Sequence, residues 1–176
     1  MATQWTTPKT WNSGDVLTAT DLDTYVRDNT SWLGTDKPNC RVFNSAAISI
    51  PNNTFTVLTF DSERWDNQNM HSTVSNTSRL TVPSNMAGKY LITAHAAWGT
   101  ALTNAQLGAI ELRVNGSTII AEDSSVSRNQ MSISTVWSFN AADYVEVLVL
   151  QNTGGAINIS ATSSFSPEFT AMWLGN

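Results

Sequence analysis

Few residues of this sequence are suited to nucleophilic or acid–base chemistry. The chain has two histidines, His71 and His95, and a single cysteine, Cys40. A hydrolase with a nucleophilic serine on a sharp turn would show a GxSxG pattern, and the sequence has none. The metal-binding pattern HExxH and the nucleotide-binding patterns GxxxxGKS/T and GxGxxG are absent as well. The sequence therefore predicts a protein that is not an enzyme and needs no cofactor.

The other candidate groups have simpler structural interpretations. A catalytic thiol needs a basic partner, so Cys40 is expected to be a small buried side chain. A lone cysteine also excludes an internal disulfide framework and a CxxC metal site. His95 is expected on a strand face, as a packed or interface histidine. Paired carboxylates for glycoside hydrolysis stay an open alternative, although the glutamates lie on predicted strands or turns in no recognisable catalytic setting: Glu63, Glu111, Glu122, Glu146 and Glu168.

One acidic loop carries the oxygen atoms that a calcium ion prefers. The stretch DSERWD, from Asp61 to Asp66, offers carboxylates to a cation that takes roughly six to eight oxygen ligands. Its spacing is not that of an EF-hand, so a solvated turn is the favoured interpretation. Calcium near Asp61 and Asp66 stays an open alternative, and no metal site is predicted.

The composition excludes several classes of partner. Charged residues make up 13% of the 176-residue chain, well below the roughly 25% of an average globular domain. The net charge of −5 comes with no basic stripe that would bind nucleic acid. No apolar run reaches the roughly 18–20 residues of a membrane span. The sequence thus predicts a protein that binds neither nucleic acid nor membrane.

The first segment, residues 1–38, is expected to form an arm and one short helix. Apolar residues recur at helical spacing over Val16–Leu33. Thr20 is the expected N-cap, with Asp23 three residues on as a weak capping box, and Gly34 is expected to end the helix. A helix of this length is marginal alone, so it needs packing.

Large aromatic side chains are concentrated in the same segment. Trp5, Trp11 and Trp32 are found there, and Pro8 lies between the first two. Because so short a segment has no core, either the rest of the chain or a partner must cover these rings. Both interpretations stay open on sequence grounds, since large aromatics serve burial and interface anchoring alike.

From about Arg41 the hydrophobic pattern changes from helical spacing to alternation, which is typical of strands. Turn residues such as Asn115-Gly116 separate the alternating segments. The expected strands are residues 55–60, 79–82, 88–98, 109–114, 117–122, 130–139, 143–150, 156–160 and 169–174. Such a series of short antiparallel strands, about ten in all, predicts an all-β sandwich or jelly roll over residues 39–176.

One predicted strand, residues 143–150, is apolar on both faces. Tyr144, Leu148 and Leu150 lie on the face opposite its three valines. A strand with two apolar faces is expected to be buried on both of them. Because no helix is predicted to cover the second face, another subunit is the natural cover. The sequence therefore predicts an oligomer with Tyr144, Leu148 and Leu150 in its interface.

The motifs of residues 41–176 follow an order that resembles C1q/TNF-like jelly-roll domains. The residues matching the family's "F", "FTVP" and "GxYxI" segments are Phe60, Asp61, Leu80, Val82, Pro83, Gly88, Tyr90 and Ile92. LRVNGSTIIAED is similar to the family's hairpin, DYVEVLVLQ to its GDYVxVxVxQ strand, and SPEFTAMWLG to its closing strand. Ala142 stands where the family usually has glycine. The resemblance implies a C1q/TNF-like jelly roll that assembles as a compact trimer.

The N-terminal segment is similar to a leader found on structural proteins of tailed bacteriophages. That leader has the form WxTPxTWxxG(D/E)x(L/V)TAxxLNxx(I/V)RDN, and Asp23 replaces its usual asparagine. The matching residues are Trp5, Thr7, Pro8, Thr10, Trp11, Gly14, Asp15, Leu17, Thr18, Ala19, Leu22, Val26, Arg27, Asp28 and Asn29. The resemblance implies a location on the surface of a virion.

Together the two resemblances favour a non-enzymatic, homotrimeric virion structural protein. Because only residues 1–38 precede the β domain, we expect a capsid decoration protein or a short head projection, bound to the major capsid protein or a tail protein. The residues expected to dock on the virion are Trp5, Pro8, Trp11 and Trp32. The alternative is a tail-tip or tail-fibre head that recognises a host-surface glycan, with Trp65 or Trp98 stacking on sugars. A depolymerase is the least favoured function, for lack of a catalytic grouping.

Overall fold

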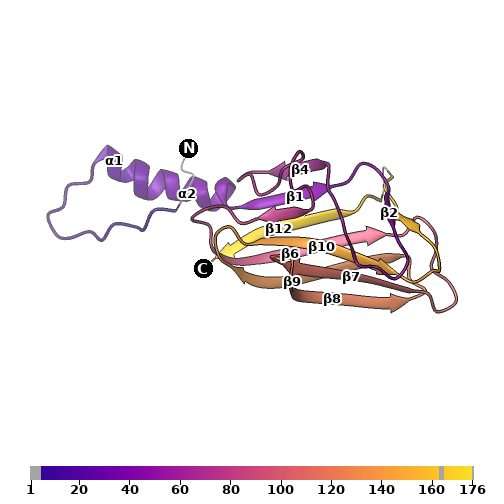
Figure 1. The fold of residues 1–176 in the computed structure, drawn as a ribbon. Helices are drawn as coiled ribbons and strands as arrows, with labels where there is room; N and C mark the ends of the chain where they lie inside the picture. Colours follow the sequence, from indigo (N-terminus) through magenta and orange to yellow (C-terminus); the bar gives the residue numbers. More distant parts are fainter. Residues whose placement is uncertain (1–4, 163–164, 176) are drawn as a thin grey trace. The chain divides into compact units, whose positions relative to one another are not determined.

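The computed structural model describes residues 5–162 and 165–175. The chain folds into two compact units, the first reaching to Lys37 and the second beginning at Pro38. Within the described residues, the first unit contains the helical segment and the second contains the strands (Figure 1).

The helix of the first unit begins at a reciprocal capping box. The backbone N–H of Asp21 donates to the Thr18 hydroxyl at 3.1 Å, and the Thr18 N–H donates to the Asp21 carboxylate at 3.1 Å. These bonds satisfy amides that have no partner within the helix, and they fix its start at Ala19. Short α-helical segments alternate with wider π-type turns along it: α1 (Ala19–Asp21), η1 (Leu22–Asp28), α2 (Asn29–Ser31) and η2 (Trp32–Asp36).

Both ends of the helix differ from the prediction. Thr20, the predicted cap, lies inside the first turn, because Thr18 and Asp21 form the capping box instead. Gly34, the predicted end, lies within η2, and the helix continues to Asp36. Lys37 has left the helical conformation, with ψ at 137°. It precedes Pro38, and a proline disfavours the helical conformation of the residue before it.

The arm before the helix folds back along it (Figure 1). The Thr6 N–H donates to Oδ1 of Asn29 at 2.9 Å, and Nδ2 of Asn29 donates to the Thr6 carbonyl at 2.7 Å. The indoles of Trp5 and Trp32 pack with 6.0 Å between ring centroids. The first unit is therefore a hairpin of arm and helix, which we call the leader hairpin.

The second unit is a sandwich of two larger antiparallel sheets (Figure 1). Sheet 1 has the strand order β4-β1-β12-β6-β9. Its strands are β1 (Asn39–Phe43), β4 (Ser62–Asp66), β6 (Gly88–Ala97), β9 (Gln130–Phe139) and β12 (Glu168–Gly175).

Sheet 2 has the strand order β3-β10-β7-β8, and β5 pairs with β10 as well. Its strands are β3 (Thr56–Val57), β5 (Arg79–Thr81), β7 (Leu107–Val114), β8 (Thr118–Val126) and β10 (Tyr144–Gln151). A smaller sheet pairs β2 (Ile48–Ile50) with β11 (Ile157–Ile159).

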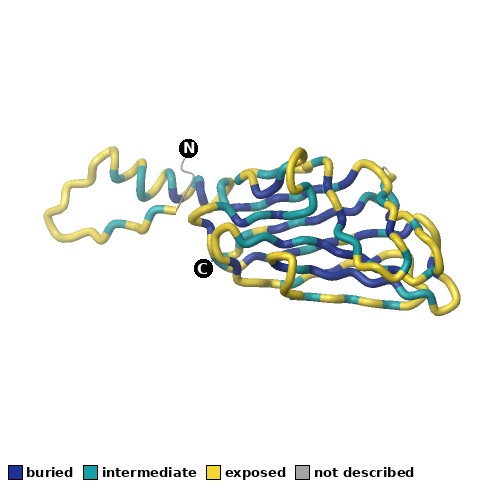
Figure 2. The backbone as a smooth tube through the Cα atoms, in the orientation of Figure 1, coloured by how far each residue is buried: buried dark blue, intermediate teal, exposed yellow. Residues whose placement is uncertain are grey.

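The core lies between the inner faces of sheets 1 and 2. Buried and more exposed residues alternate along much of β6 and β9, as Figure 2 shows for sheet 1, so these strands turn one face inward. The rings of Phe60 and Phe169 pack in this core at 5.5 Å. Tyr90 is fully buried, and its hydroxyl donates to the Met86 carbonyl at 2.7 Å, which satisfies its polar end. One face of sheet 1 is filled in this way, and its other face points away from this core.

The predicted all-β sandwich is confirmed, with differences at individual strands. Strand β9 begins and ends where the alternation predicts, whereas β3 covers only Thr56–Val57 of the predicted 55–60. The sequence pattern does not predict β1, β2 or β4. Strand β4 occupies the stretch interpreted as a solvated turn, because Ser62–Asp66 pairs with β1.

Candidate functional site

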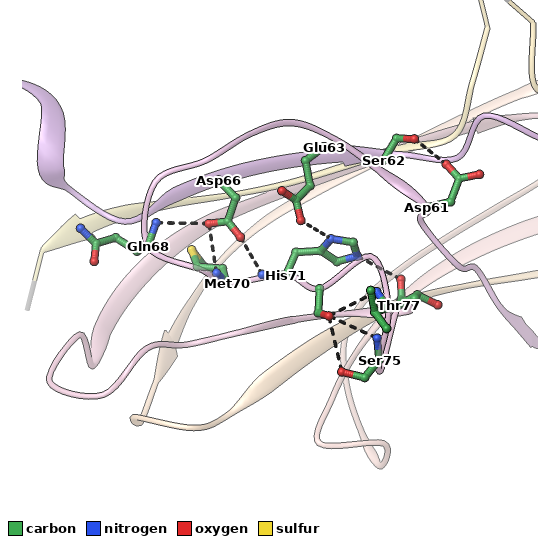
Figure 3. A network of polar contacts seen from close by, with 11 residues as sticks. Asp61, Ser62, Glu63, Asp66, Gln68, Met70, His71, Ser75 and Thr77 are labelled. Carbon is green, nitrogen blue, oxygen red and sulfur yellow. Dashed lines mark hydrogen bonds and ion pairs between the residues drawn. The ribbon is translucent and has the colours of Figure 1, made fainter.

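A polar network beside β4 brings together several of the reactive side chains (Figure 3). Nδ1 of His71 lies 3.0 Å from Oε1 of Glu63, and Nε2 lies 3.2 Å from the Thr77 carbonyl oxygen. The His71 side chain is completely buried. Because both ring nitrogens already face acceptors, neither is placed to take a proton from a nucleophile. His71 therefore connects the loop after β4 to that strand. Its ring is not positioned to act as a general base.

Asp66 holds the same loop through its backbone. Its carboxylate accepts hydrogen bonds from the N–H groups of Gln68 at 3.2 Å, Met70 at 3.0 Å and His71 at 2.8 Å (Figure 3). Cys40 lies opposite Asp66 in the β1–β4 register and is fully buried, as predicted. Burial raises the pKa of the Cys40 thiol far above its ordinary value, and the nearby carboxylate of Asp66 adds to the effect. A thiol kept neutral in this way is a poor nucleophile.

The carboxylates considered for calcium already have partners. Asp61 accepts hydrogen bonds from the Ser45 N–H at 2.9 Å, the Ser45 hydroxyl at 2.7 Å and the Ser62 hydroxyl at 2.8 Å. Slight burial raises the pKa of Asp61, but these hydrogen bonds outweigh it and lower the pKa below its ordinary value. Among the described residues, no three side chains of His, Cys, Asp or Glu are placed to hold a metal ion. The geometry thus gives the calcium alternative no support.

The glutamates do not offer a free pair for glycoside hydrolysis either. Glu111 and Glu122 lie opposite each other in the β7–β8 register. Glu111 is buried, however, and its carboxylate pairs with the Arg113 guanidinium at 2.7 Å. Glu146 accepts a hydrogen bond from the Ser78 hydroxyl at 2.8 Å. Glu111 is thus engaged within β7, and Glu146 links β10 to the residue before β5.

The residues predicted to dock on the virion lie in two environments of the leader hairpin. Trp32 is buried, and Trp5 packs against it. Pro8 and Trp11 are exposed, and the Lys9 ammonium lies 4.3 Å from the centroid of the Trp11 ring. Trp5 and Trp32 therefore stabilise the hairpin, and Pro8, Trp11 and the exposed part of Trp5 remain available to a partner. Their docking role stays a prediction.

The predicted interface residues of β10 lie on the outer face of sheet 2. The register places Leu148 between Val57 of β3 and Glu111 of β7. Leu148 is only 2% exposed within the single chain, so the reasoning that another subunit must cover it is wrong. Tyr144 and Leu150 are half-buried. The interface role of these three residues stays a prediction, but it no longer follows from the need to cover Leu148.

The outer face of sheet 1 carries a cluster of charged and aromatic side chains. Glu168, on β12, is buried, and its carboxylate forms ion pairs with Arg41 of β1 and, at 2.9 Å, with Arg64 of β4. The Arg64 guanidinium lies 4.1 Å from the centroid of the Phe43 ring, and that of Arg41 lies 5.7 Å from the Trp65 ring. The two guanidinium groups are therefore held in place before any partner binds, which is a property of interface anchors.

These ion pairs set the charge state of Glu168. Its burial raises the pKa of the carboxyl, but hydrogen bonds from Arg64 and Arg41 outweigh that effect and lower the pKa below its ordinary value. The carboxylate is thus ionised at neutral pH, although it stands on a sheet face that also exposes apolar side chains.

An apolar row crosses the same face beside this cluster. The register aligns Met172 of β12, Leu91 of β6 and Val136 of β9, and Leu174 follows on β12. Met172, Val136 and Leu174 are exposed, Met172 at 45%. On a sandwich whose other face holds the core, the outer positions are usually polar, so this row indicates a covered surface.

The outer face of sheet 1 is also hollowed. One hollow of about 380 Å³ is lined by the cluster and the apolar row, including Arg41, Trp65, Thr93 and Met172. A second of about 530 Å³ lies towards the Ala97 end of β6. His95 contributes to both and is exposed on this face. Such concave, mixed surfaces are suited to side chains of a partner.

Several residues of this face escape a sequence-based search. Phe43 and Arg41 stand on the unpredicted strand β1, and Arg64 and Trp65 on the unpredicted strand β4. The short alternation of NCRVF is a signal that would reveal β1, whereas SERWD has no apolar alternation. Trp98, considered for sugar stacking, is only 4% exposed and is unavailable for that role.

Comparisons with known proteins identify the fold. No protein-family model matches the chain, and no curated protein matches it. Solved structures do match: the globular domain of zebrafish complement 1qA has 15% identity and a TM-score of 0.54, and covers 80% of this chain and 100% of its own. Murine APRIL has 10% identity and a TM-score of 0.56 over 77% of this chain and 98% of its own. Eiger TNF from S. frugiperda has 11% identity and a TM-score of 0.52 over 80% and 94%. The second unit is thus a C1q/TNF-like jelly roll, as predicted.

Proposed function

We propose that this protein is a non-enzymatic, homotrimeric structural component of a tailed-bacteriophage virion. In this proposal it is a capsid decoration protein or short head projection on the particle surface. The jelly roll forms the trimer, and the leader hairpin contacts the major capsid protein or a tail protein.

The apolar row on the outer face of sheet 1 carries the proposal. Met172, Leu91 and Val136 lie side by side on a face that the single chain leaves uncovered. Burying such side chains stabilises an assembly by about 25 cal/mol for each Å² of apolar surface removed from water. The neighbouring cluster of Arg41, Arg64 and Trp65 has the residue types that anchor protein interfaces.

The resemblance to C1q/TNF-like domains implies a trimer. The similar solved structures support the fold that this resemblance predicts. Closed rings built from one repeated contact need two complementary patches on each subunit. The outer face of sheet 1 offers them, because Val136 and Leu174 of the apolar row are exposed and do not line the hollow of about 380 Å³. In this arrangement a side chain of one subunit fills the hollow of the next.

The virion location is supported by the leader. The segment that resembles the phage leader folds into a hairpin of its own, and its turn exposes Trp11, Val16 and Leu17 to solvent. Exposed large apolar side chains clustered on one small segment mark a contact with another protein. The absence of a free catalytic grouping in the geometry of His71, Cys40 and Glu168 is consistent with a structural role.

Two measurements test the proposal. Light scattering on the purified protein should give about three times the 19.2 kDa of one chain. A monomer at micromolar concentration would overturn the trimer. Quantitative mass spectrometry of particles should find copies in a fixed ratio to the major capsid protein, whereas a copy number like that of a tail appendage would overturn the decoration role.

Glycan recognition is a second candidate function, favoured by the position of Trp65. Its ring is 44% exposed and lines the same hollow as the hydroxyls of Thr93 and Thr170. An aromatic ring beside hydroxyl groups is suited to a sugar, which needs a stacking surface and hydrogen bonds. The two functions compete for one face, because a trimer that buries the outer face of sheet 1 leaves no room for a glycan. Binding of a glycan by the intact trimer, abolished by Trp65→Ala, would favour this second function.

A further inference from the structure

The helix of the leader hairpin leaves one aliphatic stripe uncovered. Leu22, Val26 and Leu33 are 45%, 56% and 52% exposed. Their spacing of four and then seven residues places them along one side of a helix, as at the a and d positions of a coiled coil. No aromatic or charged residue belongs to the stripe.

The neighbouring side of the helix is already occupied by the chain's own arm. The arm reaches the helix at Asn29 through Thr6, and Nζ of Lys9 lies 3.3 Å from Oδ1 of Asp21. Asn29, which completes the heptad spacing between Val26 and Leu33, is buried in that contact. The arm therefore covers the helix at Asn29 and leaves Leu22, Val26 and Leu33 exposed.

The helix is joined to sheet 1 by a very short connection. Its last residue is Asp36, and β1 begins at Asn39. At Pro38 the chain is already fixed to β12, because the Trp173 N–H donates to the Pro38 carbonyl at 2.9 Å. Sheet 1 is the sheet whose outer face is proposed to form the trimer. In a trimer, each of the three chains would thus enter its jelly roll at a fixed residue directly after the helix.

We propose that the stripe of Leu22, Val26 and Leu33 packs against the same stripe of the other two subunits, which forms a parallel three-helix bundle next to the jelly-roll trimer. This inference rests on the proposed trimer. The bundle is too short to persist alone, since a helix of this length is marginal in water. The short connection at Lys37 favours association of the helices, because helices tethered to one trimer meet at an effective concentration of roughly millimolar.

The chemistry of the stripe favours a second copy over a virion protein as its occupant. Interfaces between different proteins are anchored by tryptophan, tyrosine and arginine, whereas coiled-coil seams are built from aliphatic residues at heptad spacing. The stripe is aliphatic, like a coiled-coil seam. The exposed turn of the hairpin contains Trp11, like an interface with a different protein. The leader hairpin therefore has two surfaces, a stripe for its own subunits and a turn for the particle.

Disulfide trapping of the full-length protein tests the bundle. Cys40 is the only native cysteine and is fully buried, so any disulfide between subunits would join the introduced cysteines. We expect Val26→Cys to form covalent dimers under mild oxidation, because cysteines link only where their Cα atoms approach to about 7 Å. The matched control is Thr20→Cys, an exposed position of the same helix outside the stripe, which should stay unlinked.

The outcomes separate this inference from the trimer itself. A molecular mass of one chain for the unmodified protein would overturn the proposed trimer and the bundle with it. A trimer in which Val26→Cys links no better than Thr20→Cys would overturn the bundle alone. Linkage of Val26→Cys to another virion protein in particles, with none between subunits, would also overturn it and assign the stripe to that protein.

Discussion

The indole of Trp5 packs on the indole of Trp32, with 6.0 Å between ring centroids and 60° between ring planes. This contact joins the start of the described chain to the last turns of the helix. Together with the bonds between Thr6 and Asn29, it makes the leader a folded hairpin and not an extended arm. These two rings thus have a structural role in the hairpin, although Trp5 keeps 40% of its surface exposed, close to the 44% of Trp11.

Trp5→Ala should loosen the leader hairpin and leave the jelly roll intact. An aromatic pair of this kind contributes about 0.5–1.5 kcal/mol beyond its buried area. We therefore expect faster hydrogen exchange at the amides of the helix, residues 19–36, and unchanged exchange in β6 and β12. Trp11→Ala is the control, and equal exchange in the two variants would contradict this role of Trp5.

Two aspartate substitutions should separate folding from assembly. Met172→Asp places a charge on the exposed outer face of sheet 1, so a single chain should lose no more than about 0.5 kcal/mol while the trimer dissociates. Leu148→Asp buries a charge within one chain and should unfold the jelly roll, at a cost of about 4 kcal/mol or more. Circular dichroism and light scattering on the same samples measure both effects.

The reverse pattern is equally informative. If Leu148→Asp gave folded monomers and Met172→Asp left the trimer unchanged, the interface would lie on β10, as the sequence pattern predicts.

Glu168→Gln should destabilise the protein in a pH-dependent way. The substitution leaves Arg41 and Arg64 without their carboxylate and should cost about 1–3 kcal/mol at neutral pH. The folded-state pKa of Glu168 is lowered, so its contribution is complete above the ordinary value of about 4.3 and is lost as the pH falls through the lower folded-state pKa. Urea unfolding of both proteins from pH 7 to pH 3 measures this difference, which should shrink only in the acidic range. A difference that stays constant down to pH 3 would show that Glu168 acts without its charge.

Strands with clear alternation were predictable from sequence, and polar edge strands were not. Residues 130–139 alternate except at Val136, and β9 has these bounds. Strand β4 reads SERWD and lies at the edge of sheet 1, where it packs few side chains into the core. The information that makes it a strand lies in its partner β1 and in the loop that Asp66 and His71 hold, and neither is local in sequence.

The candidate site was less accessible to prediction than the fold. Residues 143–150 are apolar on both faces, as the sequence shows, but Leu148 is buried within its own chain. Hydrophobic periodicity does not reveal whether a strand face is covered by the same chain or by another subunit. Glu168 and Arg41 lie far apart in sequence and meet only through the β1–β12 pairing. The prediction of the helix cap shows the same limit on a smaller scale, because Thr18 and Thr20 both have an aspartate three residues on.

His71→Gln should weaken the loop that follows β4. Glutamine can replace one of the two contacts that His71 makes with Glu63 and Thr77, so one buried polar partner is left unsatisfied. The expected loss is about 1–3 kcal/mol in the free energy of unfolding, measured in urea. A hydrolytic activity that disappears with this substitution while stability is unchanged would contradict the structural role.

Trp11→Ala should weaken attachment to the particle without changing the stability of the isolated protein. Trp11 is exposed in the turn of the leader hairpin, with the Lys9 ammonium 4.3 Å from its ring centroid, so its removal should leave the fold intact. An exposed tryptophan that becomes buried in a partner is a typical anchor, and its loss should cost about 2 kcal/mol or more of binding free energy. That value corresponds to a roughly thirtyfold larger dissociation constant, which can be measured by rebinding the purified protein to particles stripped of it.

Deletion of residues 1–37 should abolish rebinding altogether, and Thr10→Ala serves as the control in the same turn. If Trp11→Ala lowered the melting temperature by many degrees and rebound normally, the ring would belong to the protein's own packing and the docking surface would lie elsewhere.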